Sequence, residues 1–284
     1  MSGVRTPEPA DSPDAKRPGW LTRVRRWPMK LGAAVGAAFL AWFVSFIGPK
    51  LFDEASHSVQ GEKPPLSIAV VTDMAHFTSP ADASIGAPEF LYSGHVTQLG
   101  APPGGNDPQR SEERWAWAHK LGAVDAYTTL VRMKISGRSS TPVILNDLRI
   151  TVISRRAPPD AWLISYLGLG SAQGVRYFDV NLDRRAPVAT YVGKRNPLPL
   201  RVTDTDVEVI DLLASALRCD CRWTIKLDWA SGSKQGTMTI DDHGESFQTS
   251  GVRFTSSGEP RRAIAWFRGR WMRIGPNGIS TPLQ

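Results

Sequence analysis

The stretch RWTIKLDW, residues 222–229, decides the fold class, because its side chains alternate strictly between polar and apolar. Successive side chains of a β-strand point to opposite faces, so this alternation predicts a strand with one buried face. The predicted buried face carries Trp223, Ile225, Leu227 and Trp229. The opposite face carries Arg222, Thr224, Lys226 and Asp228.

The same alternation recurs elsewhere in the chain. Residues 127–135 and 148–152 alternate in this way, and the turn-forming segment Gly137–Pro142 lies between them, so we expect the two strands to form a hairpin. Residues 177–182 form a further alternating strand. Shorter strands are predicted at 66–72, 237–241, 246–250, 263–268 and 271–274, with Gly269 at the last hairpin turn.

One segment, Ser111–Leu121, has a helical pattern, with two acidic residues in its first turn. Many short strands separated by Gly, Pro and Asp turns are typical of an antiparallel β-sandwich or barrel. The predicted fold class is therefore mainly β, with an antiparallel β-sandwich over residues 66–284.

Length and composition narrow the function classes. The 284 residues are 41% hydrophobic and 21% charged, which excludes wholesale disorder. Two cysteines exclude a disulfide-dense scaffold and a four-cysteine zinc site. The chain carries 34 Lys+Arg against 27 Asp+Glu, a net charge of +7, which indicates nucleic acid only if the charge gathers on one folded face.

The segment Leu31–Gly48 contains no charged residue. At a helical rise of ~1.5 Å per residue it spans ~27 Å, close to the ~30 Å hydrocarbon core of a bilayer. Basic residues outnumber acidic ones before it, so the positive-inside rule predicts a cytoplasmic N-terminus and an extracytoplasmic C-terminal domain at the plasma membrane. A buried core helix and a cleaved signal peptide are the alternatives.

This topology predicts four parts of the chain. They are a disordered basic cytoplasmic tail at 1–30, a single-pass transmembrane α-helix and signal anchor at 31–48, a stalk at 49–65 and an extracytoplasmic β-sandwich at 66–284. Within the helix, Gly32 and Gly36 have the GxxxG spacing that lets two helices approach closely. A homodimer through this helix is one interpretation, and the general abundance of Gly in membrane helices is the other.

Cys219-Asp220-Cys221 is the most distinctive short motif. In an unbroken strand the two cysteines would lie about 6.6 Å apart, whereas a disulfide brings its Cβ atoms to about 3.8 Å. The strand-like run 206–229 is too long for one ordinary strand, so we expect a break near 218–222 and a hairpin turn at the cysteines. Three interpretations stay open: a Cys219–Cys221 disulfide, buried free thiols, and a redox or metal role.

Asp241-Asp242-His243-Gly244 has two interpretations. The first is a tight Asp/Gly turn between two strands. The second is a catalytic cluster of a cell-envelope hydrolase, which requires a third polar group beside His243. The turn is favoured. The sequence contains none of the common catalytic or nucleotide-binding motifs, so we assign no catalytic residue and expect neither a cofactor nor a metal.

Arginines and aromatic residues interleave near the C-terminus. On strands, the alternation predicts that the aromatic side chains point inward and the arginines outward. The outward set is Arg261, Arg262, Arg268, Arg270 and Arg273. It is either a solvated surface or a face that binds an anionic partner. Outside a cell that partner is an anionic envelope polymer, a lipid headgroup or an acidic protein, and not nucleic acid.

Three segments carry a resemblance to a known group of proteins. They are WAHKLGAVDA (117–126), VRMKISGRSSTPVIL (131–145), and RCDCRW (218–223) continuing to IDDHG (240–244). Together they resemble uncharacterised actinobacterial single-pass membrane-anchored proteins with a β-rich extracytoplasmic domain, over roughly residues 110 to 250. The resemblance implies the fold and the anchor, and it implies no activity and no functional residue.

The sequence thus favours a membrane-anchored extracytoplasmic binding or interaction module rather than an enzyme. Its partners would be the lipid bilayer together with a protein or an anionic envelope polymer. The alternatives are the hydrolase that uses Asp241, Asp242 and His243, and a signalling or scaffold subunit that dimerises through Gly32 and Gly36.

Overall fold

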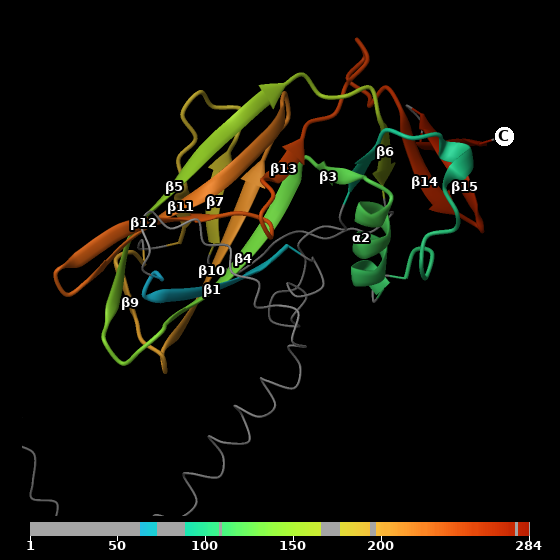
Figure 1. Ribbon diagram of the computed structural model, residues 1–284. Coiled ribbons are helices and arrows are strands. Elements are labelled where there is room, and N and C mark those ends of the chain that lie inside the picture. The colour runs from blue at the N-terminus through green and yellow to red at the C-terminus, as the bar shows by residue number, and fades with distance from the viewer. Residues whose placement is uncertain are drawn as a thin grey trace, which may run out of the picture. The chain divides into compact units, whose positions relative to one another are not determined.

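The computed structural model describes residues 63–72, 89–107, 110–165, 177–193, 197–275 and 278–283 (Figure 1). The chain divides into two units, Met1–Lys50 and Leu51–Gln284, and all described residues belong to the second. The predicted tail, the transmembrane helix with Gly32 and Gly36, and nearly all of the stalk lie outside the described residues. Among the described residues, no helix is both long and apolar enough to cross a membrane.

The described chain is mainly β, and its sheets form a sandwich-like arrangement. The first sheet has the spatial order β1-β4-β10-β7-β8, antiparallel except for the parallel pair β10 and β7. Its strands are β1 (Leu66–Val71), β4 (Thr128–Gly137), β10 (Val207–Ser215), β7 (Tyr177–Asn181) and β8 (Thr190–Val192).

The second sheet is longer, and one half of it faces the first sheet. That half contains the predicted strand of residues 222–229, which lies within β11. Its strands are β13 (Phe247–Ser250), β11 (Asp220–Ser231), β5 (Val143–Arg156) and β9 (Leu200–Val202), with β12 (Lys234–Ile240) also paired to β11. We call this half, together with the first sheet, the sandwich.

The other half of the second sheet joins the sandwich where β3 pairs in parallel with β13. Its strands are β3 (Val124–Ala126), β2 (Phe90–Tyr92), β6 (Trp162–Ser165), β14 (Ala263–Phe267), β15 (Arg270–Gly275) and β16 (Gly278–Pro282). Helix α2 (Ser111–Lys120) supplies Trp115 and Trp117 to the core of this half. We call this half with α2 the tryptophan sheet.

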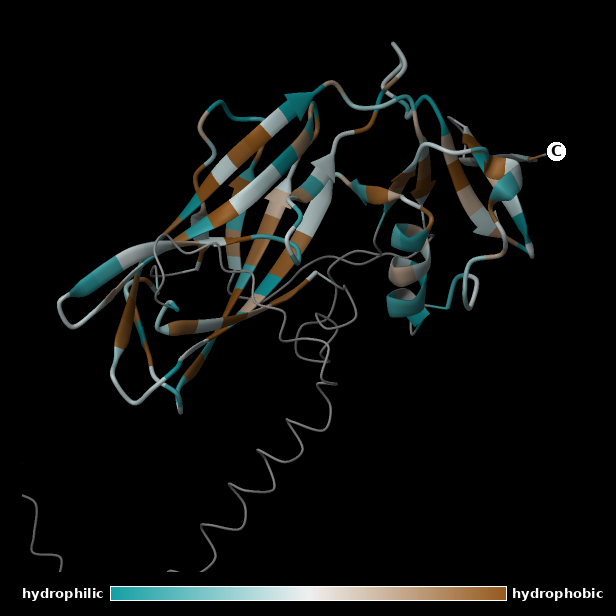
Figure 2. Cartoon of the chain, in the orientation of Figure 1, coloured by the Kyte–Doolittle hydropathy of each residue, from teal (hydrophilic) through white to brown (hydrophobic). Residues whose placement is uncertain are grey.

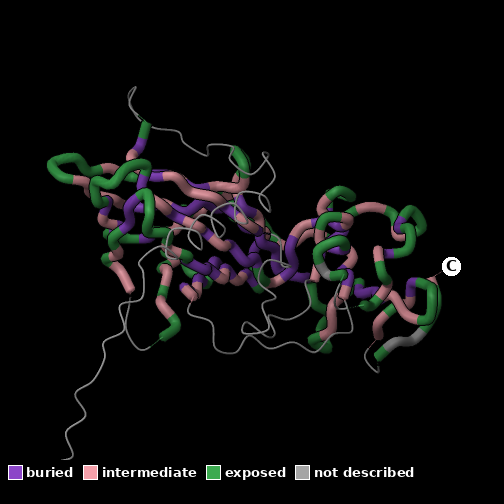
Figure 3. Tube along the Cα trace, turned by 90° about the horizontal axis from the view of Figure 1, so that it is seen from below, coloured by how far each residue is buried: buried purple, intermediate pink, exposed green. Residues whose placement is uncertain are grey.

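The sandwich core is built from the inward faces of both sheets. Val131 and Met133 of β4 enter it from one side, and Trp223, Ile225 and Leu227 of β11 enter it from the other; all five side chains are buried. Figure 2 shows the alternation of hydrophobic and hydrophilic residues along β5 and β11, and Figure 3 shows that the buried residues lie mostly in the interior of the described chain. The alternation predicted for residues 222–229 is confirmed, except that Thr224 is also buried and Trp229 is only partly buried.

The predicted hairpin of residues 127–135 with 148–152 is wrong. Both strands exist, but β4 pairs with β1 and β10, whereas β5 pairs with β11 and β9 in the opposite sheet. The chain crosses between sheets after Gly137, whose backbone N–H donates to the carbonyl of Thr203 at 2.9 Å. A Cβ at Gly137 would lie 3.0 Å from the Thr203 backbone, so glycine permits the close approach.

The remaining predicted elements have mixed outcomes. The helix at 111–121 and the strands at 66–72, 177–182, 237–241, 246–250, 263–268 and 271–274 are confirmed within one to three residues at each end. Gly269 lies in the β14–β15 turn with φ +80°, as expected for a glycine there. It is not the last hairpin turn, because β16 follows and pairs with β15.

Candidate functional site

The five C-terminal arginines fall into two groups. Arg261 and Arg262 directly precede β14, and Arg273 lies on β15, where it pairs with Ile264. Arg268 and Arg270 flank the Gly269 turn, at the far end of the same hairpin. The structure therefore gathers three members of the predicted basic face at one end of the hairpin and leaves the other two at its tip.

Strand pairing brings Trp162 to the first group. Strands β6 and β14 run parallel, and the Leu163 N–H donates to the Arg262 carbonyl at 2.9 Å. Trp162 is the residue immediately before Leu163, so it lies beside Arg262. The guanidinium carbon of Arg262 lies 5.6 Å from the centroid of the Trp162 ring, and that of Arg273 lies 5.5 Å from it. Both distances are within the ~6 Å range of a cation–π interaction.

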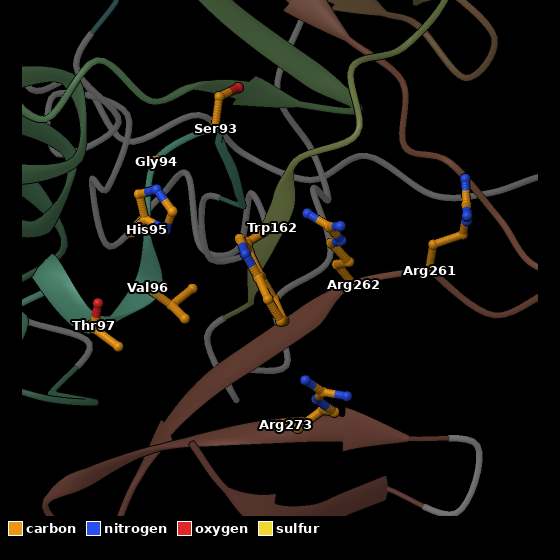
Figure 4. Close-up of a pocket in the computed structure, with 9 residues that line it drawn as sticks. All are labelled: Ser93, Gly94, His95, Val96, Thr97, Trp162, Arg261, Arg262 and Arg273. Carbon is orange, nitrogen blue, oxygen red and sulfur yellow. The ribbon is translucent and has the colours of Figure 1, made fainter. Parts of the chain in front are cut away.

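These residues line an open pocket of about 540 Å³, which we call the arginine pocket (Figure 4). Its described lining consists of Ser93, Gly94, His95, Val96, Thr97, Trp162, Arg261, Arg262 and Arg273. Three of these side chains are permanently cationic, and none of the described lining residues is acidic. Asp160, just outside this set, contacts Arg262 at 3.2 Å. The pocket is therefore strongly electropositive.

The segment Ser93–Thr97 forms the other wall of the arginine pocket. In Figure 4 it lies on the opposite side of Trp162 from Arg261 and Arg262. Gly94 permits this segment to cover the buried Tyr92 ring, because a Cβ at position 94 would lie 2.3 Å from the Tyr92 hydroxyl oxygen. The segment contributes two hydroxyls and an imidazole, which can exchange hydrogen bonds with a ligand.

The predicted separation of aromatic and arginine side chains onto opposite faces is wrong for this hairpin. Trp271 and Arg273 are two residues apart on β15, so they share a face, and Trp271 is buried while Arg273 is exposed. Trp266 and Trp271 pair across the hairpin with ring centroids 5.3 Å apart. The arginines of the pocket thus rim the aromatic cluster instead of lying behind it.

No protein-family model, curated protein or solved structure matches this chain. The chemistry of the arginine pocket follows from its own residues. Three guanidiniums offer planar forks of N–H donors, which match the oxygens of carboxylate and phosphate groups.

Cys219 and Cys221 are joined by a disulfide with a Cα–Cα distance of 5.4 Å. The expected chain break exists, but it lies at 216–219, where the chain passes from β10 in one sheet to β11 in the other. The hairpin turn expected at the cysteines is therefore wrong, and Cys221 already pairs with Thr249 as part of β11.

The carboxylate of Asp183 holds this crossover in place. It accepts hydrogen bonds from the backbone N–H groups of Leu217 and Arg218 at 2.9 and 3.0 Å. Cys221 is fully buried and Cys219 nearly so, beside a smaller pocket of about 260 Å³ that Arg155, Arg156 and Arg218 help to line. The disulfide therefore lies in a buried, hydrogen-bonded part of the fold, where the chain crosses from one sheet to the other.

The Asp241–Gly244 segment is a tight turn. Gly244 donates its N–H to Asp241 Oδ1 at 2.9 Å, and His243 Nδ1 lies 3.0 Å from Asp242 Oδ1. The turn connects β12 and β13, which both pair with the same edge of β11. The His243 side chain is 46% exposed. Within the described ranges, no three His, Cys, Asp or Glu side chains are grouped to hold a metal ion.

Sequence reasoning missed half of the arginine pocket. Trp162 and the Ser93–Thr97 segment are far from the arginines along the chain. The parallel pairing of β6 with β14 and the antiparallel pairing of β6 with β2 bring them together. It also missed the contact of His119 with Asp125, in which Nε2 of His119 lies 3.0 Å from Oδ1 of Asp125. The ring of that histidine also lies edge-on to the ring of Phe90 on β2, with centroids 5.8 Å apart, and this contact packs α2 onto the tryptophan sheet.

Proposed function

We propose that this protein is a membrane-anchored binding module that docks an anionic component of the cell envelope through its arginine pocket. The observation that carries the proposal is an open pocket lined by Arg261, Arg262 and Arg273, two of which, Arg262 and Arg273, lie over the Trp162 ring. Three cations held together repel one another, and a bound anion relieves this repulsion. A pocket with this charge therefore favours an anionic ligand.

The anchor is the part of the proposal that rests on sequence alone. Leu31–Gly48 has the length and apolarity of a transmembrane helix, and the basic excess before it favours a cytoplasmic N-terminus. In this topology the residues from 66 onward are extracytoplasmic, and Gly32 with Gly36 offers a face for homodimerisation. The same proposal includes the resemblance of this chain to actinobacterial single-pass membrane-anchored proteins.

The anchor has a direct test. The full chain is produced in cells, and the membranes are washed with alkaline carbonate. We expect the protein to remain in the membrane pellet and residues 66–284 to be cleaved by a protease added outside intact spheroplasts. Release by carbonate, or protection of these residues from the external protease, would refute the proposed topology.

The docking function is tested with the full chain in micelles of a neutral detergent. Binding to immobilised polyuronate and polyphosphate is measured, with neutral dextran as the reference. We expect the double variant R262A/R273A to lose at least about tenfold in affinity, because each lost charged hydrogen bond is worth about 1.5 kcal/mol or more.

The matched control is R268A/R270A, which removes the same charge from the tip of the same hairpin. We expect it to keep its affinity within about twofold, since surface charges away from a contact contribute little. Equal losses in the two variants would show that binding follows net charge and not the arginine pocket.

A further inference from the structure

We propose that the arginine pocket recognises a phosphorylated sugar, with the phosphoryl group against the arginines and the sugar hydroxyls against Ser93–Thr97. This inference rests on the proposed function, because it names the chemical class of the anion that the docking site takes.

The number of guanidiniums favours a phosphoryl group over a carboxylate. A carboxylate presents two oxygens, which one arginine fork satisfies in a bidentate manner. A phosphoryl group presents three strong acceptor oxygens and up to two negative charges. Arg261, Arg262 and Arg273 all line the pocket, so three guanidiniums border the space that one ligand would occupy. Asp160 engages Arg262 through one contact of 3.2 Å, which leaves other N–H groups of that fork for a ligand.

Trp162 holds two of these cations in a usable orientation. A guanidinium above an aromatic ring is attracted by the ring, while its N–H groups lie in its own plane and point outward from its edge. Arg262 and Arg273 both lie within 5.6 Å of the Trp162 centroid. One indole ring therefore limits the motion of two long side chains, so less conformational entropy is lost when an anion binds them.

The size of the arginine pocket exceeds that of a bare ion. Its volume of about 540 Å³ lies in the range of ~300–1,000 Å³ that is typical of sites for small organic ligands. The wall opposite the arginines carries the hydroxyls of Ser93 and Thr97 and the imidazole of His95, all on exposed residues. These groups both donate and accept hydrogen bonds, as sugar hydroxyls do. The ligand that matches both walls carries a phosphoryl group and neighbouring hydroxyls.

The test is isothermal titration of the full chain in neutral detergent micelles with five soluble probes. They are a hexose 6-phosphate, inorganic phosphate, glycerol phosphate, a hexuronate and a neutral hexose. We expect the hexose phosphate to bind about tenfold or more tightly than each of the others, because only it satisfies both walls. Glycerol phosphate stands for a phospholipid headgroup, so its tighter binding would assign the pocket to lipid and overturn the sugar.

The two proposals can fail separately. Tighter binding of the hexuronate than of the hexose phosphate would overturn the phosphoryl selectivity and leave the docking of anions intact. Binding of no anion by the arginine pocket, with R262A/R273A and R268A/R270A behaving alike, would overturn both.

Two double variants test separately how each wall of the arginine pocket contributes to binding. R262K/R273K keeps the charge but removes the planar forks, and we expect about tenfold weaker binding of every phosphate probe. S93A/T97V removes the two hydroxyls, and we expect it to weaken the hexose phosphate about tenfold while inorganic phosphate binds as before. Unchanged binding of the hexose phosphate by S93A/T97V would overturn the assignment of the sugar wall. Circular dichroism of each variant confirms that it is folded.

Discussion

The sandwich and the tryptophan sheet share one continuous sheet but treat their charged residues differently. In the sandwich, arginines have acidic partners on neighbouring strands: Arg132 forms two bonds of 2.7 Å to Asp211, and Arg149 contacts Asp228 at 2.6 Å. In the tryptophan sheet, Arg262 and Arg273 lie over one indole ring, Arg261 lines the same pocket, and the one acidic contact printed for this group is that of Asp160 with Arg262 at 3.2 Å. The paired charges of the sandwich stabilise the fold, whereas the arginines gathered in the arginine pocket give it an excess of positive charge that a bound anion can neutralise.

The tryptophans of the two regions also differ, because one is buried in the core and the other lies at a surface pocket. Trp223 of the sandwich is fully buried, packs on Phe247 with ring centroids 4.8 Å apart and donates its indole N–H to Thr249 at 3.1 Å. Trp162 of the tryptophan sheet is only half-buried and contacts two guanidiniums. One tryptophan is a core residue, and the other supports a surface pocket.

The largest expected effect is on the free energy of unfolding, and it should differ between substitutions of these two tryptophans. Trp223→Ala is expected to lower the free energy of unfolding by about 4 kcal/mol, because it leaves a cavity and removes the buried hydrogen bond that the Thr249 hydroxyl accepts. Trp162→Ala, the matched control, is expected to cost less than about 1.5 kcal/mol. Urea unfolding followed by circular dichroism measures both. Equal losses would refute the division between a core residue and a pocket residue.

A medium effect is expected at the sheet crossing. Cys219→Ser with Cys221→Ser removes a cross-link over a very short loop, for which the loop-closure model gives about 1.6 kcal/mol. We therefore expect the melting temperature to fall by about 3 to 6 °C. Intact mass after alkylation, with and without reductant, reports whether the bond is present. A variant with the melting temperature of the wild type would show that Asp183 and the strand pairing alone hold the crossing.

The smallest effect concerns Tyr127, which joins β3 of the tryptophan sheet to β4 of the sandwich. Burial, and secondarily the charge of Glu89, raise the pKa of Tyr127 to about 12. The neutral phenol is thus favoured in the folded state, so its contribution to stability is complete below pH 10 and is lost as the pH rises from 10 to 12.

Tyr127→Phe removes this titration. Because Tyr127 is only half-buried, we expect the difference from the wild type to be under about 1 kcal/mol across that pH range. Tyr191→Phe in the sandwich serves as the control. Identical pH profiles of the wild type and Tyr127→Phe between pH 9 and 12 would contradict the raised pKa.

Sequence periodicity predicted the strands well because it depends only on which face of each strand is buried. It could not predict which strand pairs with which. Strands of both sheets bury one face in the same core, so they show the same alternation whichever sheet they belong to. The 127–135 and 148–152 strands illustrate this: both have the expected inward residues, yet they lie in opposite sheets. The deciding contact, Gly137 to Thr203, joins residues remote in sequence.

The candidate site was predicted only in part, because its assembly also depends on strand pairing. The arginines were visible as a cluster in the sequence, but alternation alone placed all five on one face. The pairing of Leu163 with Ala263 determines which of them meet Trp162, and that parallel pairing has no local signal. Arg268 and Arg270 are separated from the arginine pocket because they flank the turn at the other end of the hairpin.

The central claim, that anion binding belongs to the tryptophan sheet and not to the sandwich, has one direct test. Hydrogen–deuterium exchange of the full chain is measured with and without saturating hexose 6-phosphate. The account predicts protection confined to residues 93–97, 162–165, 261–265 and 272–274, with no change in β4, β10 or β11. Protection centred on the sandwich strands, or beside Cys219 at the smaller pocket, would contradict it.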